Sequence, residues 1–256
     1  MKWALKDQVN LYKYEERLTD EGYEYIAGCD EAGRGALAGP LVVASCILPK
    51  DSRIEGINDS KKLSSKKREE LYKKIIRKAV AYKIVYISPK IVDELNIYEA
   101  TKKGMLEAIN GLKVKPDYAL IDAMPLSMLD IKHESVVHGD ALSASIGAAS
   151  ILAKVARDHY MAKMDFKYPK YGFAHNKGYG TKMHMDAIWE MGPTKIHRKT
   201  YYPVSAYLVK DRQLTIDFDN DDNYDDEENW YENISFFLYI YNIDNKAKNF
   251  LKIYKI

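Results

Sequence analysis

The sequence predicts an α/β protein in which helices pack against the faces of one sheet. Short apolar runs typical of buried strands alternate with segments whose apolar residues recur at helical spacing. This alternation favours a layered α/β architecture. The chain has 256 residues, of which 46% are hydrophobic. A chain of this length buries a sizeable core as one domain, or as one domain with an appendage.

The first half of the chain contains three strand-like runs with helical segments before and between them. Ser64 or Ser65 is a candidate N-cap for the second helix, because a serine hydroxyl can accept a hydrogen bond from a backbone N–H at a helix start. In chain order we expect a charged helix at 7–24, strands at 25–29 and 41–48, a helix through Leu71, Ile75, Ile76 and Ala79, a strand at 81–88 and a helix at 89–112.

The second half begins with two apolar runs that end in acids, "YALIDAMPL" with Asp122 and "SVVHGD" with Asp140. A segment rich in alanine and serine follows, and its apolar residues recur at helical spacing. We expect a helix there that packs closely against the sheet. Residues 168–203 are rich in Tyr, Gly, His and Lys, and we expect loops with one short helix at 182–190.

Charge is distributed unevenly along the chain, although the net charge is only +2. Residues 211–256 contain 11 acids and 5 bases, whereas the preceding residues contain 34 bases and 26 acids. A basic body fits a polyanionic partner, because each neutralised phosphate releases counterions. The acidic stretch at 211–233 is a candidate disordered linker.

Cysteine usage and hydropathy bear on where the protein works. Cys29 and Cys46 lie in strand-like apolar runs, so we expect buried, reduced thiols, as in an intracellular protein. The chain opens with a mixed, charged segment rather than a signal peptide. No apolar run has the length needed to span a membrane. We therefore expect a cytoplasmic protein without a membrane partner.

Acidic residues end three of the apolar runs: Asp30 with Glu31, Asp122, and Asp140. A carboxylate that ends a buried strand lies at the sheet edge, where connecting loops gather and sites form. Several such acids repel one another unless a cation compensates them, and oxygen ligands suit Mg²⁺ or Mn²⁺ better than zinc. The alternatives are a solvated surface pair at Asp30, a turn that starts at Asp122 and a helix N-cap at Asp140.

Two glycine-containing stretches are candidate substrate contacts. Gly33 and Gly35 let the backbone approach a ligand closely, and Arg34 between them supplies donors for a phosphate. In "YGFAHNKGYGTKMH", Tyr179 stands between glycines and could stack on a base or sugar, while Lys177 could hold a phosphate. The alternatives are a plain tight turn and a flexible loop with an incidental tyrosine.

Together these stretches resemble one family, ribonuclease HII, the type 2 ribonuclease H of bacteria. The matching segments cover residues 25–204 in the order of the family: "AGCDEAGRGALAGPLVVA", "INDSKKLS", "ELNIYEAT", "LIDA", "HGDALSASIGAASILAKVARD", "YGFAHNKGYGT" and "GPTKIHRKTYYPV". The resemblance implies a ribonuclease H-like mixed sheet flanked by helices, with a smaller helical C-terminal portion. It implies a catalytic domain at 25–206. Outside the resemblance we expect an N-terminal helical extension at 1–24 and an acidic tail of unknown role at 207–256.

The resemblance also implies a reaction and a catalytic set. Asp30, Glu31, Asp122 and Asp140 match the four catalytic carboxylates that hold divalent metal, Mn²⁺ or Mg²⁺. The implied reaction is endonucleolytic hydrolysis of RNA in RNA–DNA hybrids, including single ribonucleotides embedded in duplex DNA. It leaves 3′-hydroxyl and 5′-phosphate ends and serves ribonucleotide excision repair and DNA replication. We expect a monomer.

Substrate contacts follow from the same resemblance. The segment Gly33-Arg34-Gly35 matches the one that senses the ribonucleotide 2′-hydroxyl at an RNA–DNA junction. Tyr179 matches the tyrosine that stacks on the neighbouring deoxyribose, and Lys177 is a further candidate contact with the substrate.

The sequence departs from the family pattern in two places and leaves rival functions open. Ala36 stands where the family commonly has proline, and Asn176 stands where histidine usually precedes the lysine. Asp158 is typical of the family, but on an unbroken helix from Asp140 it would lie about 27 Å away, so we leave it outside the site. The rivals are a related ribonuclease H with poor activity on single ribonucleotides and a hybrid-binding protein without catalysis.

Overall fold

The structure is a computed structural model that describes residues 10–51, 53–57, 60 and 63–219. The chain divides into two compact units, Met1–Lys210 and Asp211–Ile256. The elements described below belong to the first unit, except that the last helix continues to Asp219. Most of the predicted acidic tail and the first nine residues of the predicted N-terminal extension lie outside the described residues.

A five-stranded mixed sheet forms the centre of the first unit, in the order β3-β2-β1-β4-β5. The strand β1 is antiparallel to β2, and β2 is antiparallel to β3. On the other side of β1, the strands β4 and β5 both run parallel to it. The strands are β1 Ile26–Ala32, β2 Leu41–Ile47, β3 Ala81–Ile87, β4 Tyr118–Asp122 and β5 Lys132–Val136.

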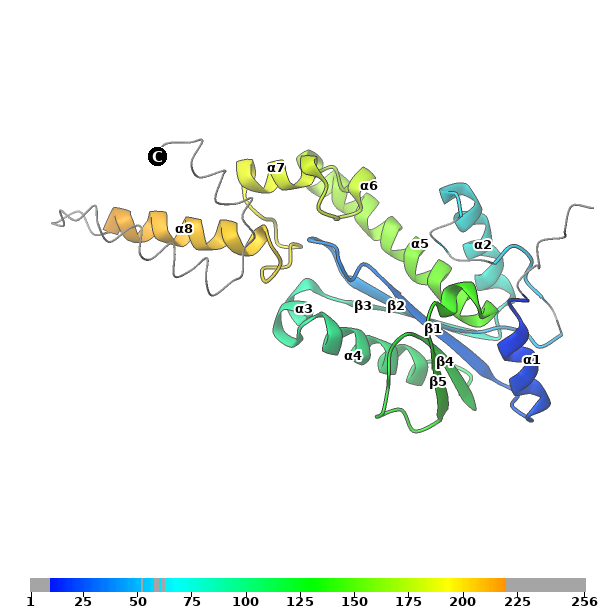
Figure 1. Cartoon of the computed structure of the whole chain (residues 1–256). Coiled ribbons are helices and arrows are strands. Elements are labelled where there is room, and N and C mark those ends of the chain that lie inside the picture. Colours follow the sequence, from blue (N-terminus) through cyan, green and yellow to red (C-terminus); the bar gives the residue numbers. More distant parts are fainter. Residues whose placement is uncertain (1–9, 52, 58–59, 61–62, 220–256) are drawn as a thin grey trace, which may run out of the picture. The chain divides into compact units, whose positions relative to one another are not determined.

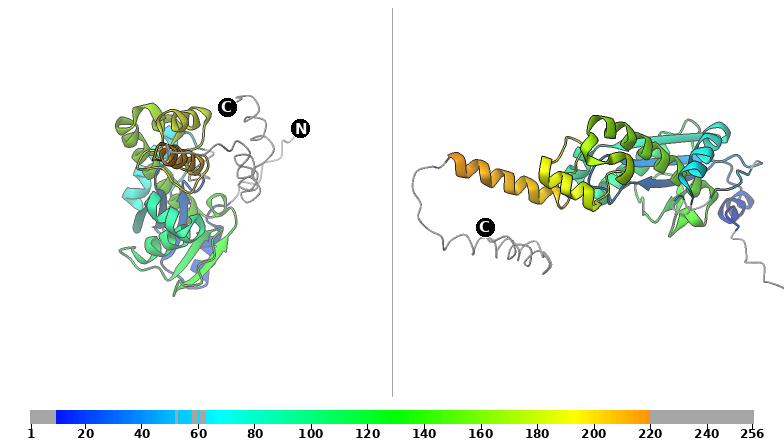
Figure 2. Two further views of the ribbon diagram at one scale, coloured as in Figure 1. Left: turned by 90° about the vertical axis from the view of Figure 1, so that its left-hand side faces the viewer. Right: turned by 90° about the horizontal axis from the view of Figure 1, so that it is seen from above.

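Helices cover both faces of this sheet (Figure 1). The long helix α5 crosses β1 and β2 on one face with α2 beside it, and α4 packs on β2 and β3 from the other face. Two further directions of view are given in Figure 2. The helices are α1 Lys13–Asp20, α2 Ser65–Lys78, α3 Pro89–Leu95, α4 Ile97–Asn110, α5 Ala144–Lys167, α6 Phe173–Asn176, α7 Lys182–Met191 and α8 Val204–Asp219, with single 3₁₀ turns η1 Gly139–Ala141 and η2 Pro169–Tyr171.

Every residue of β2 is buried, because helices cover the strand from both sides. Val42 and Ala44 point into the core shared with α5, whereas Leu41 and Val43 point into the core shared with α4. This accounts for a strand that is apolar throughout rather than alternating.

The helix α5 lies unusually close to β1. A Cβ atom added at Gly28 would come within 2.0 Å of the carbonyl carbon of Ser145, so only glycine fits at this position. The alanines of α5 allow the same close approach along the helix, since small side chains keep the backbones near each other. The start of α5 is thereby fixed against the strand that carries Asp30.

The predicted helix at 89–112 is wrong in one respect, because it is two helices that meet at Asn96. The backbone of Asn96 has φ 66°, which interrupts the helical path. Its side-chain oxygen then accepts hydrogen bonds from the N–H groups of Tyr98 and Glu99, at 2.9 and 3.1 Å, and caps α4. Asparagine tolerates this conformation better than most residues, which is why the break occurs here.

The run that ends with Asp140 also differs from expectation. The strand β5 ends at Val136, and Asp140 lies beyond it in the turn η1. The alternative that Asp140 caps the following helix is wrong, because the N-cap of α5 is Ser143, whose hydroxyl accepts from Ile146 N–H at 3.2 Å. The other predicted elements are present with boundaries shifted by a few residues, and Ser64 caps α2.

Both cysteines are buried and free, as predicted. Within the described ranges, no helix is long and apolar enough to cross a membrane. The first nine residues of the stretch predicted as a linker at 211–233 continue α8 to Asp219, and the remainder lies outside the described residues.

Candidate active site

Three of the predicted carboxylates lie together at one edge of the sheet. The parallel strands β1 and β4 pair Cys29 with Ile121, so the next position on each strand carries an acid, Asp30 and Asp122. Cys29 and Ile121 point into the core under α4. Because side chains alternate along a strand, Asp30 and Asp122 point to the other face, where α5 lies.

A cleft of about 360 Å³ opens at this edge and collects groups from distant parts of the chain. It brings the three carboxylates together with the glycine segment that follows β1 and with Tyr179, as the sequence predicted for a shared site. Its lining consists of Asp30, Glu31, Ala32, Gly33, Arg34, Gly35, Ser60, Asp122, Ser150, Lys154 and Tyr179.

The electrostatics of the cleft centre on Asp30, which is only 5% exposed. Burial raises the pKa of the Asp30 carboxyl well above its usual range, and the negative charges of Glu31 and Asp122 raise it further. Hydrogen bonds from the Ser150 side chain and from the Glu31 N–H, at 2.6 Å, oppose this shift. The carboxylates therefore repel one another inside a poorly solvated cleft.

The fourth predicted carboxylate, Asp140, is buried nearby but occupies a different place. In the part of the chain that the structure describes, Asp140 is not among the residues that line the cleft. It follows Gly139, whose N–H donates to Asp122 Oδ1 at 2.8 Å. The turn that carries Asp140 thus holds Asp122 in place.

The carboxylates are suited by their chemistry to a divalent cation. They supply only oxygen ligands, which hard cations such as Mg²⁺ and Mn²⁺ prefer. Their mutual repulsion, seen in the raised pKa of Asp30, is what a cation relieves. Among the described residues, no three His, Cys, Asp or Glu side chains stand close enough to hold an ion as they are.

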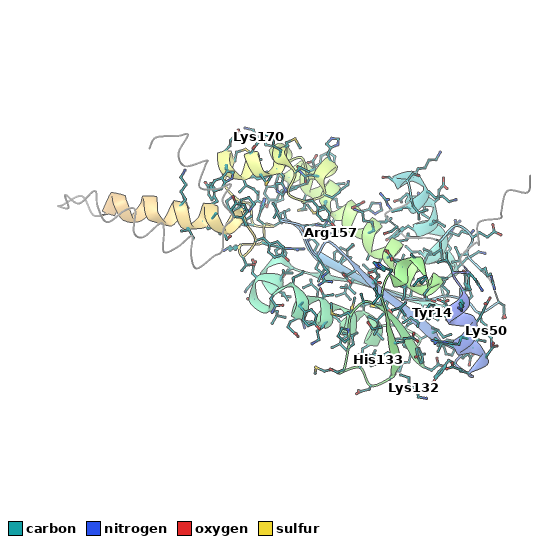
Figure 3. The ribbon with its side chains drawn as sticks, in the orientation of Figure 1. Tyr14, Lys50, Lys132, His133, Arg157 and Lys170 are labelled. Carbon is teal, nitrogen blue, oxygen red and sulfur yellow. The ribbon has the colours of Figure 1, made fainter. Side chains whose placement is uncertain are left out.

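The segment from Gly33 to Pro40, called here the glycine loop, is held from behind by a buried arginine of α5. Arg157, labelled in Figure 3, donates to the carbonyls of Ala38, Pro40 and Lys177 at 3.0, 3.0 and 2.8 Å. Gly33 has φ 94°, and a Cβ atom there would lie 2.0 Å from Arg157 Nε. Glycine is thus required at position 33 by the packing of the arginine.

A second buried arginine holds the same loop. Arg198 donates to the carbonyls of Gly33 and Arg34 at 2.7 and 2.6 Å, and to that of Gly39 at 3.3 Å. Burial lowers the pKa of both Arg157, to about 10, and Arg198. With a pKa of about 10, Arg157 keeps its charge at neutral pH. The side chains of Arg157 and Arg198 together bind the carbonyl side of the glycine loop.

Tyr179 lies on a loop that is joined to the glycine loop through the backbone. The carbonyl of Gly178 accepts from the N–H groups of Leu37 and Ala38, at 2.8 and 3.2 Å. The ring of Tyr179 is 38% exposed and lies 5.3 Å from the Arg157 guanidinium carbon. A fixed, partly exposed ring at the rim of the cleft can stack on a sugar or base.

The neighbouring residues of this loop have structural roles. The Lys177 carbonyl binds Arg157, and within the described residues Lys177 is not part of the cleft lining. Asn176, which departs from the family pattern, is buried. Its side chain accepts from Gly178 N–H and donates to the Tyr171 carbonyl, both at 2.7 Å. The asparagine therefore fixes the turn that presents Tyr179.

Sequence reasoning missed the serines and the lysine of the cleft. Ser150 and Lys154 are four residues apart on α5 and so share one helix face, which is a signal that could have indicated them. Lys154 pairs with Asp158 at 2.7 Å. Asp158 itself lies outside the cleft lining described here, and it reaches the site only through this lysine.

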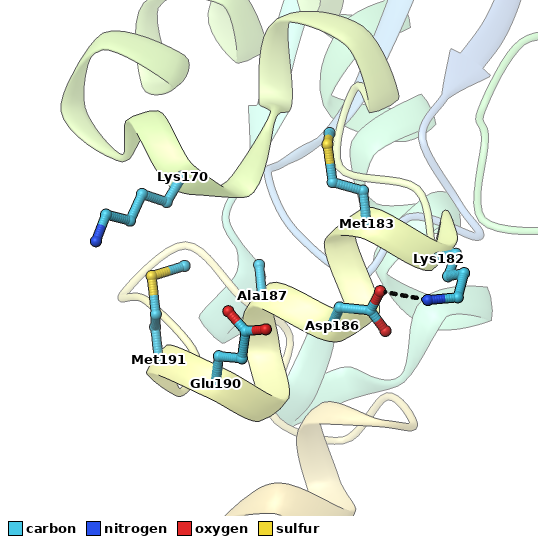
Figure 4. A pocket seen from close by; sticks show the side chains of 7 residues that line it. All are labelled: Lys170, Lys182, Met183, Asp186, Ala187, Glu190 and Met191. Atoms are coloured by element: carbon cyan, nitrogen blue, oxygen red, sulfur yellow. Dashed lines mark hydrogen bonds and ion pairs between the residues drawn. The ribbon is translucent and has the colours of Figure 1, made fainter.

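A larger pocket of about 700 Å³ lies between η2 and α7 (Figure 4). Lys170 comes from η2, and the other six lining residues come from α7. Its acids are Asp186, which pairs with Lys182 at 2.8 Å, and Glu190. Both belong to one exposed helix face, so this pocket lacks the buried carboxylates that mark the cleft at the sheet edge.

Comparisons with known proteins identify the family. The family model for Ribonuclease HII matches residues 27–204. A ribonuclease HII from Desulfitobacterium hafniense (strain Y51) is 52% identical over 198 residues, 77% of this chain and 76% of the relative. That of Bacillus subtilis (strain 168) is 50% identical over 205 residues, 80% of each protein. The solved ribonuclease H2 from Pyrococcus horikoshii OT3 superposes with a TM-score of 0.64 at 28% identity, over 74% of this chain and 99% of that one. The chain therefore belongs to the ribonuclease HII family and is a ribonuclease H enzyme.

Proposed function

We propose that this enzyme hydrolyses the RNA strand of RNA–DNA hybrids and also cuts at single ribonucleotides embedded in duplex DNA. The observation that carries the proposal is the shared cleft, in which three carboxylates meet the glycine loop and Tyr179. Cleavage of a phosphodiester and recognition of the adjoining sugars require these groups within one site. The products would carry 3′-hydroxyl and 5′-phosphate ends.

In this proposal Asp30, Glu31, Asp122 and Asp140 hold two divalent ions, Mg²⁺ or Mn²⁺. The ions supply activation of the attacking water and stabilisation of the leaving 3′-oxygen. The protein contributes fixed positions, since the N–H of Gly139 orients Asp122 and the hydroxyl of Ser150 orients Asp30. Lys154, held by Asp158, adds positive charge for the phosphate at the rim of the cleft.

The glycine loop supports recognition of a 2′-hydroxyl through its backbone. In a trans peptide the C=O and the following N–H point in opposite directions. The carbonyls of Gly33 and Arg34 point to Arg198, so the N–H groups of Arg34 and Gly35 point away from it. Donors fixed in this direction can read the hydroxyl that distinguishes RNA from DNA.

The test is cleavage of two substrates by the wild-type enzyme and by Asp30→Asn. One substrate is a DNA duplex with a single ribonucleotide, the other a uniform RNA–DNA hybrid, each with Mg²⁺ or Mn²⁺. We expect the wild type to cut both, and Asp30→Asn to lose roughly a hundredfold or more of cleavage while hybrid binding largely survives.

Each alternative outcome has a distinct meaning. Full activity of Asp30→Asn would contradict the metal assignment. Cleavage of the uniform hybrid alone would indicate the related type of ribonuclease H that handles single ribonucleotides poorly.

We further propose that the enzyme acts as a monomer in the cytoplasm. Light scattering in the presence of substrate duplex would check the monomeric state.

A further inference from the structure

Two histidines form a direct pair behind the loop that carries Tyr179. His184 on α7 is fully buried, and His197 is 2% exposed. Their Nε2 atoms lie 3.0 Å apart. Within the described residues, no other pair of imidazoles is hydrogen-bonded, and neither the cleft nor the carboxylates include these two rings.

The partners of the pair determine where its protons lie. His184 Nδ1 is 2.9 Å from the Tyr179 carbonyl, which can only accept, so Nδ1 carries a proton. His197 Nδ1 accepts from the Thr194 N–H at 2.9 Å, so it carries none, and the Thr194 hydroxyl, also 2.9 Å away, can donate to the same nitrogen. His197 Nε2 then holds the proton of that ring and donates to the bare Nε2 of His184. Hydrogen bonds are thus donated from Thr194 N–H to His197, from His197 to His184, and from His184 to the Tyr179 carbonyl.

The surroundings favour the neutral form of both rings. Tyr171 and Phe173 pack their rings against the pair, with centroid distances from 5.2 to 6.4 Å. Burial lowers the pKa of His197 to about 4, helped by the neighbouring His184, and burial also lowers the pKa of His184. A proton added to His184 Nε2 would place donor against donor between the two rings.

This chain of hydrogen bonds joins both parts of the recognition surface. One end is the backbone of Tyr179. The other end belongs to the segment 194–198, which also bridges to Ala38 through His197 and donates from Arg198 N–H to the Leu37 carbonyl at 2.8 Å. The same segment ends with Arg198, the guanidinium that binds the glycine loop.

We propose that His184 and His197 are positioning residues that fix Tyr179 relative to the glycine loop for recognition of the ribonucleotide junction. The inference rests on the proposed function of Tyr179. The direction of the hydrogen bonds, in addition to the packing of the rings, sets the position of Tyr179.

Two variants of one residue separate hydrogen bonding from packing. Asparagine places an amide N–H near the position of Nδ1, whereas glutamine reaches the position of Nε2. His184→Asn therefore keeps the bond to Tyr179, and His184→Gln loses it. We expect His184→Gln to lose roughly tenfold to a hundredfold in kcat/KM on the single-ribonucleotide duplex, and His184→Asn to lose much less. Cleavage of the uniform hybrid should fall less in both.

The controls separate this inference from the proposed function. Thermal melts establish that the two variants are similarly folded. If Tyr179→Ala cuts the single-ribonucleotide duplex normally, the proposed role of Tyr179 fails. If Tyr179→Ala is impaired but His184→Asn and His184→Gln lose the same activity, the rings act by packing alone and the inference is overturned.

The proton positions can be measured without any activity. Long-range ¹H–¹⁵N spectra of the wild-type enzyme distinguish the two neutral tautomers of histidine. We expect His184 protonated at Nδ1 and His197 at Nε2, both neutral at pH 7. The reverse tautomers, or a charged ring at that pH, would overturn the chain of donors described here.

Discussion

The two glycines of the Gly33-Arg34-Gly35 segment are there for different physical reasons. Gly33 has a positive φ and is packed against Arg157, so the fold itself requires it. A Cβ atom at Gly35 would meet no heavy atom of the protein within 4 Å, and its backbone is one that other residues adopt. Folding therefore does not explain Gly35, whereas the proposed close approach of a substrate sugar would explain it.

Gly35→Ala should therefore separate function from stability. We expect the free energy of unfolding to change by less than about 0.5 kcal/mol, because the added methyl group meets open space. Cleavage of the single-ribonucleotide duplex should fall roughly tenfold or more, because the methyl group occupies space meant for substrate. Urea unfolding and initial cleavage rates measure the two effects.

Gly33→Ala is the matched control for this prediction. It should destabilise the protein clearly, since the new Cβ would collide with Arg157. Unaltered cleavage by Gly35→Ala would contradict close approach of the substrate at this position.

The buried His197 makes stability depend on pH. Its pKa of about 4 lies below the ordinary histidine value of 6.5, so the unfolded chain binds a proton more readily than the native one. Neutral His197 therefore contributes roughly 3 kcal/mol to the free energy of unfolding above pH 6.5, and this contribution is lost as pH falls toward 4. His197→Asn should reduce the pH dependence of the free energy of unfolding between pH 6.5 and pH 4, which urea denaturation over a pH series measures. Equal pH dependence of the two proteins would show that His197 does not titrate in this way.

At the scale of elements, the helix α1 caps the start of α5. Glu15 Oε1 accepts from Ser143 Oγ at 2.6 Å and from Ser145 N–H at 2.8 Å. A carboxylate is favourable at this place, because the N-terminus of a helix carries partial positive charge. The helix α1, which precedes the part matched by the family model, thus supports the segment that follows Asp140.

Glu15→Gln should cost about 1 kcal/mol of unfolding free energy, since the charge that faces the helix terminus is lost. The midpoint of urea denaturation measures it. Glu16→Gln is the control, because Glu16 pairs with Arg53 at the surface and should change stability by less than about 0.5 kcal/mol. A larger effect at Glu16 than at Glu15 would contradict the capping role.

The elements also show what the sequence could and could not predict. Acids at strand ends placed Asp30 and Asp122 correctly, because parallel neighbouring strands end at one sheet edge. Local spacing could not reveal the break at Asn96, which depends on one residue adopting φ 66°. Asp140 was expected at the end of a strand, but it lies in the turn η1, which is held by its contacts with β4 and α5.

The buried arginines and histidines behind the recognition loops had no local signal. Arg157 and Arg198 bind carbonyl groups more than a hundred residues away in the chain, and carbonyl groups are present in every residue. His184 also binds a backbone carbonyl, that of Tyr179, and a carbonyl partner leaves no signal in the sequence even when it lies nearby in the chain. The family resemblance indicated the residues that line the candidate site, whereas the buried arginines and histidines that hold its loops were found only in the structure.

For the whole molecule, the uneven charge predicts how hybrid binding responds to salt. Residues 1–210 carry a net charge of +8 and residues 211–256 one of −6. A variant that ends at Lys210 should bind the hybrid roughly several-fold more tightly than the full chain at low salt, because the acidic part no longer repels phosphates.

This difference in affinity should vanish toward 0.5 M salt, because the Debye length is then about 4 Å and charges farther apart are largely screened. Fluorescence anisotropy over a salt series measures both proteins. An equal affinity of the two chains at low salt would mean that the acidic residues do not face the substrate.

The arginines behind the glycine loop have a consequence for protein engineering. The loop comes from the end of β1, Arg157 from the middle of α5, and Arg198 from the segment that follows α7. A designer who grafts the loop alone onto another nuclease leaves its carbonyls without their cationic partners, and the grafted backbone relaxes. If the glycine loop reads the sugar as proposed, it can be transferred to another protein only together with the segments that carry Arg157 and Arg198.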